Sequence, residues 1–475
     1  MNRNNIWIHL GIVLILVTLA AVLGQIDRLR TGLRPAMSET RDLKRGIPKP
    51  ATMKRTRSES EPEVLVRFRP GVTRAQIERI VARNNDRIED RLELVRGLKA
   101  IDDLDNADPR TIADHYAAMT DVVEYAEPNY TIEVGLPEFK PVAERSDDSG
   151  LELPNDPHFS EQWGLSNDGQ SGGKQGADIA ARKAWETSKG SSDVVVAVLD
   201  TGVDYTHPDL ISNIWIRPDN IPQYSDPELG TFNDRHGFNA QDNLSDPMDD
   251  NGHGTHCAGI IGAEADNDIG IAGVNWNVKI MPLKFLGRGG FGTTKDAIEA
   301  INYAVDRKQK GVNIRVISAS WGSVQRSKAL EDAIRAAGEH GILFVAAAGN
   351  SSTDNDRRPH YPSNYDLPNV ISVAALDRSD LLASFSNYGA KTVHVAAPGK
   401  EIVSTWLNES YREASGTSMA TPHVAGIAAL ILANEPDIAV EELRARLIKA
   451  VDPLEALSGR TVSGGRINAA MALAP

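Results

Sequence analysis

Residues 416–426 read GTSMATPHVAG and place one serine at the start of a strongly apolar segment. Beyond Pro422 the apolar side chains cover every face instead of one stripe, which predicts a buried helix. We expect Pro422 in its first turn, where a missing N–H costs little. Ser418 then lies at the positive end of the helix dipole, where a developing oxyanion is stabilised. A simple helix N-cap is the other interpretation of this serine.

Two further segments offer the partners that a nucleophilic serine needs. The run VVVAVL at 194–199 is typical of a parallel strand covered on both faces, and Asp200 follows it directly. Open α/β sheets carry their active sites at such strand ends. His253 lies in NGHGTHCAG at 251–259, between glycines that allow close backbone approach. The set predicts that Ser418 attacks, histidine takes its proton and aspartate orients the imidazole.

Each of these signals has another interpretation when it is taken singly. A strand-end aspartate is also a common turn or helix-cap residue. The triplet that begins at Asp200, Asp-Thr-Gly, also occurs in aspartic proteases, but these need two such carboxylates and the sequence has one such triplet. A metal site at His253 and His256 lacks a following Cys or His at zinc-like spacing.

These segments resemble the active-site blocks of subtilisin-like serine proteases, the subtilases. The matching stretches are VLDTGVD at 198–204, HGTH at 253–256 and GTSMATP at 416–422. A fourth block, VAAAGN at 345–350, resembles the strand of the family that carries its oxyanion-hole asparagine. The resemblance runs from about Asn155 to the end of the chain. It implies a serine endopeptidase in which the Asn350 amide and the Ser418 N–H hold the tetrahedral oxyanion.

The same resemblance implies that an extended substrate binds as an added strand, with little demand on its sequence. The substrate cleft of the family has two edges. The end of segment 314–322 resembles one edge, and GGFG at 289–292 resembles the opposite edge. The implied substrate-binding residues are Gly290, Gly292, Ser320, Trp321, Gly322 and Gly349. Core packing is the alternative for Trp321, expected near the P1 pocket. Asp249 and Asp250 are interpreted as solvated loop carboxylates, with a contact to the P2 side chain as the alternative.

A structural calcium ion is also implied by the resemblance. The single cysteine, Cys257, excludes an intramolecular disulfide, so an exported protease needs another stabiliser such as oxygen ligands around Ca²⁺. Three separated segments resemble the calcium site of the family. The implied ligands are the side chains of Asp156, Asp209 and Asn267 and the carbonyls of Ala265, Ile269 and Ile271. Acidic turns without a metal are the alternative.

The first part of the chain differs in composition from the rest. Residues 6–23 are nearly all apolar and have basic residues on both sides, so 1–24 is predicted to be a signal peptide or an N-terminal membrane anchor. Residues 25–61 lack periodicity and read as a flexible basic linker. Either form of the N-terminus implies an exported protein, secreted or anchored in the cell envelope. The net charge of −14 argues against a nucleic-acid partner.

Residues 62–134 show the strand and helix pattern β-α-β-β-α-β, which is typical of a ferredoxin-like α+β fold. The segment also resembles the inhibitory propeptide that precedes subtilase domains, above all at EYAEPN, residues 124–129. The resemblance implies a folding aid and intramolecular inhibitor whose tail fills the substrate groove until it is cut. An independent binding module is the alternative. Residues 135–153 are polar and read as the processing linker.

Residues 154–475 are predicted to form one α/β domain with a mostly parallel sheet between two layers of helices, as in subtilisin. The strand candidates that alternate with helices are 194–199, 279–284, 314–319, 343–347, 370–375 and 393–396. The sequence as a whole predicts a monomeric, calcium-stabilised serine endopeptidase that acts on polypeptides and is made as a self-processing zymogen. A catalytically silent binding or scaffold protein of the same fold is the alternative.

Overall fold

The computed structural model of the chain describes residues 63–135, 140–141 and 154–474. The predicted signal peptide or anchor and the basic linker lie outside these residues, as does most of the processing linker. In the described part of the chain, no helix has the length and apolar character that crossing a membrane requires.

The first sheet has four antiparallel strands in the order β2-β3-β1-β4. Its elements follow the predicted order: β1 (Val64–Phe68), α2 (Arg74–Arg83), β2 (Asp86–Asp90), β3 (Leu98–Asp103), α3 (Pro109–Ala117) and β4 (Val123–Pro128). Thr73 begins α2 with a capping box, and Asp108 accepts backbone N–H groups at the start of α3. Both helices cover one face of the sheet, where Val81 and Tyr116 are buried.

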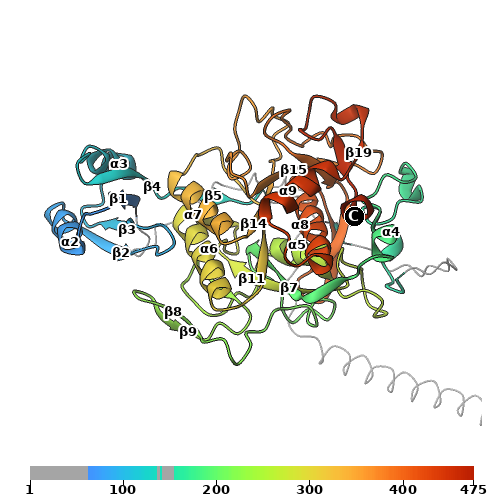
Figure 1. Cartoon of the computed structure of the whole chain (residues 1–475), viewed down its shortest axis with the longest axis horizontal. Coiled ribbons are helices and arrows are strands. Elements are labelled where there is room, and N and C mark those ends of the chain that lie inside the picture. Colours follow the sequence, from blue (N-terminus) through green and yellow to red (C-terminus); the bar gives the residue numbers. More distant parts are fainter. Residues whose placement is uncertain (1–62, 136–139, 142–153, 475) are drawn as a thin grey trace, which may run out of the picture. The chain divides into compact units, whose positions relative to one another are not determined.

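The central sheet of nine strands contains all six predicted strands (Figure 1). In spatial order it consists of β10 (Phe238–Asn239), β11 (Asn277–Lys284), β7 (Gly190–Asp200), β13 (Ile314–Ala319), β14 (Leu343–Ala347), β15 (Val370–Leu376), β16 (Val395–Pro398), β20 (Gly465–Ile467) and β19 (Val451–Pro453). Neighbouring strands are parallel except at the β19–β20 edge. The predicted α/β architecture is therefore confirmed.

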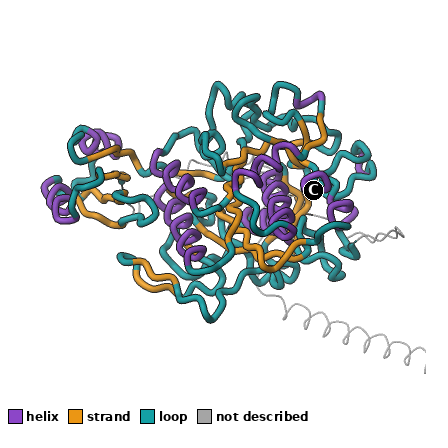
Figure 2. The backbone as a smooth tube through the Cα atoms, viewed as in Figure 1, coloured by secondary structure: helices purple, strands orange, loops and turns teal. Residues whose placement is uncertain are grey.

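Helices cover both faces of this sheet (Figure 2). Alternate residues of β7 face opposite cores, because successive side chains of a strand point to opposite faces. Val196 and Val198 join the core formed with α5 (His253–Gly262) and α8 (Thr417–Asn434). Ala197 and Leu199 join the core formed with α6 (Thr294–Gln309) and α7 (Lys328–Glu339). A strand that is buried on both faces needs the continuous apolar run seen in its sequence.

Helix α8 lies in the interior, and every residue from Thr417 to Leu432 is buried. It packs against α5 and against strands β7 and β13 to β16. The expectation that Pro422 lies in the first turn is wrong. The helix begins earlier, at Thr417 after Gly416, so Pro422 lies inside it. A proline there leaves the carbonyl of Ser418 without its helical hydrogen bond.

Shorter elements surround the central sheet. The remaining helices are α4 (Ala181–Trp185), α9 (Val440–Lys449) and α10 (Ala469–Ala472), with 3₁₀ turns at Phe159–Glu161, Gln170–Gly172 and Glu455–Leu457. The remaining strands are β5 (Thr131–Glu133), β6 (Lys140–Pro141), β8 (Tyr224–Asp226), β9 (Gly230–Phe232), β12 (Phe291–Thr293), β17 (Ile402–Trp406) and β18 (Ser410–Ala414). The β5–β12 pair brings the end of the first region onto the second, since its two strands come from opposite sides of the predicted processing linker.

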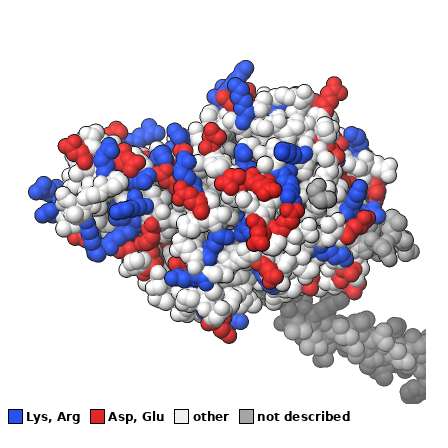
Figure 3. Space-filling model, in the orientation of Figure 1, with Lys and Arg blue, Asp and Glu red and all other residues white. Residues whose placement is uncertain are grey.

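Charged side chains of both signs are interspersed on the face of the molecule in Figure 3. No continuous basic stripe, of the kind that follows a nucleic-acid backbone, crosses the described residues on that face.

Candidate active site

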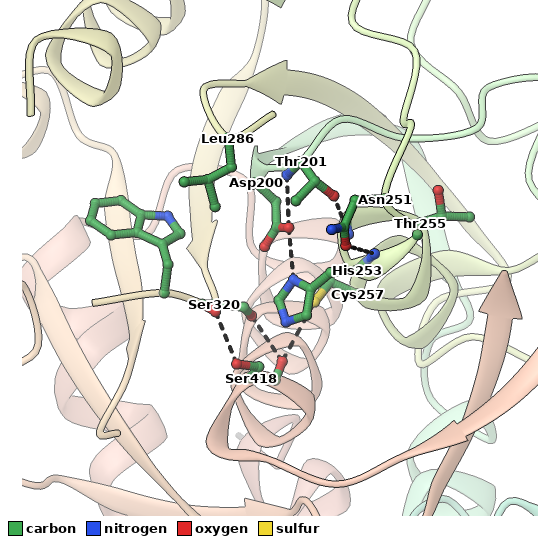
Figure 4. Close-up of polar contacts among 12 residues, drawn as sticks. Asp200, Thr201, Asn251, His253, Thr255, Cys257, Leu286, Ser320 and Ser418 are labelled. Carbon is green, nitrogen blue, oxygen red and sulfur yellow. Dashed lines mark hydrogen bonds and ion pairs between the residues drawn. The ribbon is translucent and has the colours of Figure 1, made fainter. Parts of the chain in front are cut away.

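The three residues predicted to act together lie at the ends of three different elements (Figure 4). Asp200 ends β7, His253 begins α5 and Ser418 lies in the first turn of α8. The Nδ1 of His253 lies 2.7 Å from Oδ1 of Asp200, and the same oxygen accepts the N–H of Thr201 at 2.7 Å. Both side chains of the Asp–His pair are 1% exposed or less, which strengthens their interaction.

The Ser418 hydroxyl is close to this pair but bonds elsewhere. Its Oγ donates to the backbone carbonyl of Ser320 at 2.9 Å. Among the described residues, the buried Nε2 of His253 has no hydrogen-bond partner. The imidazole therefore presents a free nitrogen, held in a fixed orientation by Asp200. A hydrogen bond between a catalytic hydroxyl and its base is commonly long or poorly aligned in a free enzyme, and it tightens when substrate binds.

The Ser418 carbonyl has a specific set of partners. Pro422 cannot donate to it, since proline lacks the N–H that would close this turn of the helix. The carbonyl instead accepts the Oγ of Ser320 at 2.8 Å and the thiol of Cys257 at 3.5 Å. Burial raises the pKa of that thiol well above its usual value, so the thiol stays protonated. These contacts tie the first turn of α8 to α5 and to the end of β13.

The Asn350 side chain is oriented by its own acceptor oxygen. Its Oδ1 accepts the N–H of Thr417 at 2.8 Å and the Thr417 hydroxyl at 2.9 Å. The Nδ2 end is consequently the free end, and a Cβ on Gly135 would lie 3.9 Å from it. A Cβ on Gly416 would lie 3.4 Å from Nδ2 of Asn350 and 3.6 Å from the backbone nitrogen of Ser418, so both nitrogens border the space beside Gly416.

Residues 131–135 lie between the two edges predicted to bind substrate. Strand β5 pairs with β12, with Ile132 opposite Gly292, and the N–H of Val134 donates to the carbonyl of Gly290 at 2.9 Å. On the other side, Glu133 forms an antiparallel bridge with Gly322. The chain thus fills this cleft as an added strand, the binding mode expected for a peptide.

Two of the predicted substrate-binding residues have specific packing partners. A Cβ on Gly322 would lie 2.1 Å from the His360 ring, and a Cβ on Gly349 would lie 3.1 Å from it. The His360 ring therefore leaves no space for a side chain at Gly322. At Gly349 the ring leaves little space for a side chain, and a φ of +107° also favours glycine there. Sequence reasoning missed His360, because no spacing pattern connects it to the cleft.

The Trp321 side chain faces inward, as in the core-packing alternative. It is 3% exposed, stacks edge-on against Phe285 at 4.7 Å between ring centroids, and donates its indole N–H to Leu199 at 2.8 Å. Ser320 contributes both its hydroxyl and its carbonyl to Ser418, so this strand end supports α8 directly.

The model of the subtilase family matches residues 191–465, more than half of the chain. The chain belongs to the subtilase family. Its relatives include a thermophilic serine proteinase of Bacillus sp. (strain AK1), 38% identical over 348 residues, which cover 73% of this chain and 72% of that protein. Thermitase of Thermoactinomyces vulgaris is 37% identical over 317 residues, 66% of this chain and 97% of that protein. This subtilase is accordingly a serine endopeptidase, and its substrates are polypeptides.

Solved structures give the same fold. The structure of fervidolysin from Fervidobacterium pennivorans, described as a keratinolytic enzyme related to subtilisin, superimposes with a TM-score of 0.67. The match covers 87% of this subtilase and 61% of that chain, at 26% sequence identity. Residues outside 191–465 therefore have structural counterparts as well.

Asp249 differs from its interpretation as a solvated loop carboxylate. It is 5% exposed, and its oxygens accept the Thr201 hydroxyl at 2.9 Å and the Thr255 hydroxyl at 2.6 Å. It also accepts the backbone N–H groups of Asn251, Gly252 and Thr255. Asp249 therefore connects the segment after Asp200 to the segment that carries His253, a role that single-residue patterns do not reveal.

Asp250 has a different role from its neighbour. Its Oδ1 lies 2.7 Å from Nζ of Lys284, which is 3% exposed and also donates to the carbonyls of Thr201 and Leu286. The buried ammonium needs these oxygens, because an unpaired charge is costly inside a protein. Asp250 and Lys284 thus support the end of β7 from the side of β11.

The structure brings together the three segments predicted to bind calcium. Asp156 and Asp209 are 4% and 0% exposed, and burial raises both carboxyl pKa values, to about 6 and about 7. The charge of Asp266 adds to the rise at Asp156, and the charge of Asp156 adds to the rise at Asp209. The Oδ1 of Asp156 has no hydrogen-bond partner among the described residues. Asn267 points its amide N–H group at Asp209, and its Oδ1 accepts the N–H of Ile269. The two buried carboxylates fit a hard cation. For Asn267 to bind the same cation through Oδ1, its side-chain amide must rotate so that Oδ1 and Nδ2 exchange places.

Replacing Asp249 tests its connecting role. We expect Asp249→Ala, made in a Ser418→Ala chain, to lower the free energy of unfolding by about 1–3 kcal/mol, because several buried donors lose their acceptor. Urea unfolding followed by tryptophan fluorescence measures the change. Asp246→Ala, at an exposed position of the same loop, serves as the control. Equal unfolding midpoints for the two variants would contradict the role.

Proposed function

We propose that this subtilase cuts polypeptides outside the cytoplasm with Asp200, His253 and Ser418, and that it is made as an autoinhibited, self-processing precursor. The observation that carries the catalytic assignment is the buried Asp200–His253 hydrogen bond of 2.7 Å, which leaves the opposite nitrogen of the imidazole free. Such an imidazole, fixed in one tautomer, is what a general base beside a serine requires.

Each group has one task in the reaction. The Ser418 Oγ attacks the carbonyl carbon of the scissile bond, and its proton passes to Nε2 of His253. Asp200 holds the Nδ1–H and stabilises the imidazolium that forms. The oxyanion receives hydrogen bonds from Nδ2 of Asn350 and from the N–H of Ser418, worth about 3–4 kcal/mol for a single donor. His253 then protonates the leaving amine, and water releases the acyl group by the same steps in reverse order.

Autoinhibition is supported by the position of residues 131–135 between the two cleft edges. A second contact, between Glu127 and the start of α7, also holds residues 63–135 against the subtilase region. Glu127 is 9% exposed, and its carboxylate accepts the Ser327 hydroxyl and the N–H groups of Lys328 and Ala329. A carboxylate at the N-terminus of α7 also interacts favourably with the helix dipole. Residues 63–135 are therefore proposed to act as an inhibitor and a folding aid in the uncut chain.

Calcium is proposed at the site of Asp156, Asp209 and Asn267, with the carbonyls of Ala265, Ile269 and Ile271. The support is the pair of buried carboxylates, one of which keeps an unpaired oxygen. A bound Ca²⁺ compensates the negative charge of these carboxylates. It also links the segment before α4 to the loop after α5. Export rests on the apolar segment 6–23 of the sequence.

An active-site probe distinguishes the enzyme from a catalytically silent scaffold. We expect a fluorophosphonate to label the processed protein at Ser418, because His253 activates its hydroxyl, and we expect no label on the Ser418→Ala variant. Peptide mapping by mass spectrometry identifies the modified residue. Ser225→Ala is the control, because it removes an exposed serine of β8 outside the proposed site and leaves the nucleophile in place. Absence of label from the wild-type protein after removal of residues before Asn155 would favour the scaffold.

Self-processing is expected directly after Gly135. A Cβ on this residue would lie 3.9 Å from Nδ2 of Asn350, the proposed oxyanion donor, so the Gly135 carbonyl is the candidate for attack. N-terminal sequencing of the purified processed protein is expected to begin at Leu136, and a Ser418→Ala chain is expected to remain uncut. A processed product of normal size from pure Ser418→Ala protein would show that another protease makes the cut.

Calcium removal tests the proposed metal site. We expect EDTA to lower the Tm of the Ser418→Ala chain, because ligands that bind only the folded state stabilise it. Asp209→Asn is expected to reduce this response to Ca²⁺, whereas Asp266→Asn, at an exposed position of the loop that carries Asn267, keeps it. Differential scanning calorimetry with and without Ca²⁺ measures the shift. An Asp209→Asn chain with the full response would contradict the site.

A further inference from the structure

Four carboxylates that the proposed reaction does not use meet where the first sheet lies against the subtilase region. Asp90 ends β2 and Glu93 follows it, whereas Asp226 ends β8 and Glu299 lies in α6. One oxygen from each side chain lies within 4.8 Å of an oxygen of every other. Two of these carboxylates thus come from residues 63–135 and two from the subtilase region.

Two of the four carboxylates keep an unpaired oxygen in the interior. Glu299 is fully buried and accepts the Tyr224 hydroxyl at 2.9 Å through Oε1 only. Asp226 is 3% exposed and accepts the backbone N–H groups of Glu228 and Leu229 through Oδ1 only. Among the described residues, neither Oε2 of Glu299 nor Oδ2 of Asp226 has a hydrogen-bond partner. Burying carboxylate oxygens without partners is unfavourable unless a cation binds them.

The basic groups around the cluster compensate only part of its charge. Lys295 is 3% exposed, and its Nζ lies 3.4 Å from Oδ2 of Asp90. Arg91 is engaged with Glu228 at 2.9 Å, and the ammonium of Lys99 donates to backbone carbonyls. Within the described residues, the four carboxylates therefore share one ion pair with an ammonium, that of Lys295 with Asp90.

We propose that Asp90, Glu93, Asp226 and Glu299 form a divalent-cation site, with Ca²⁺ as the preferred ion, that joins the first sheet to the subtilase region. All four donors are oxygens, which Ca²⁺ prefers and which softer metals such as zinc and copper do not require. Two oxygens on one Ca²⁺ lie at most about 5 Å apart. Mutual separations within 4.8 Å therefore fit a single ion. This site is distinct from the one at Asp156 and Asp209.

The position of the site gives the cation a consequence for the uncut chain. Half of its ligands lie in residues 63–135, so the full site exists only while this region is docked. A bound cation consequently strengthens the docking, and its removal weakens it. The inference that calcium would then delay release of an inhibitor rests on the proposed function, whereas the binding of the metal does not.

Counting bound ions tests the site directly. We expect the full Ser418→Ala chain to bind one more Ca²⁺ than the same chain with Asp226→Asn or with Glu93→Gln, in equilibrium dialysis at about 1 mM free Ca²⁺. Glu93 is exposed, so Glu93→Gln decides the matter if Asp226→Asn fails to fold. Asp306→Asn, which removes a carboxylate from the same helix α6 outside the cluster, is expected to leave the number of ions unchanged.

A second measurement separates metal binding from its effect on docking. Addition of Ca²⁺ is expected to slow amide hydrogen exchange in β2 of the Ser418→Ala chain and to have no such effect in the Glu93→Gln variant. Equal numbers of bound Ca²⁺ in the parent and in Glu93→Gln would overturn the proposal. In that case burial, together with the charge of Asp90, raises the pKa of Glu299 enough for a retained proton to replace the cation. Neither measurement depends on catalysis, because Ser418 is absent from every chain used.

Discussion

The burial of helix α8 is the constraint on which the rest of the structure depends. A helix that is apolar on every face can only lie inside the protein, and α8 is buried from Thr417 to Leu432 between α5 and the central sheet. The N-terminus of α8 therefore lies at the edge of the sheet where strands β7 and β13 have their carboxyl ends. This packing brings Ser418 to the side of Asp200 and His253, although long stretches of sequence separate the three residues.

Pro422 shows how one backbone defect is compensated inside this arrangement. It frees the carbonyl of Ser418, which then accepts the Ser320 hydroxyl and the Cys257 thiol. An unpaired buried carbonyl would cost about 1–3 kcal/mol, so these contacts hold the first turn of α8 against its neighbours. The Thr417 contacts to Asn350 fix the other side of the same turn. The backbone around the proposed nucleophile is consequently held from several directions.

The sequence was sufficient to predict the sheet but not the contacts that support the site. Runs such as 194–199 and 343–347 predicted strands correctly, because strands buried on both faces must be apolar throughout. Asp249 and Trp321 were harder, since a loop carboxylate and a strand-end aromatic have the same local sequence whether they face inward or outward. The assignment of Asp200, His253 and Ser418 to catalysis stays a prediction. His360 and the carboxylates around Glu299 lacked any signal, because only tertiary contacts bring them to their neighbours.

The N-terminal region contacts the subtilase region through its backbone and through charged side chains. Strand β5 binds through main-chain hydrogen bonds, whereas Glu127 and the cluster at Glu299 bring carboxylates into the same contact region. Main-chain pairing in general makes few demands on sequence, whereas buried charged groups favour one specific partner.

A crystal structure with a peptide boronic acid shows whether Ser418, His253 and Asn350 act on one tetrahedral carbon, as we propose. We expect a bond from the boron to Oγ of Ser418, one boronate oxygen within hydrogen-bond distance of Nδ2 of Asn350, and Nε2 of His253 within hydrogen-bond distance of the adduct. An adduct on another residue, or a boronate oxygen remote from Asn350, would contradict the proposed roles of these residues.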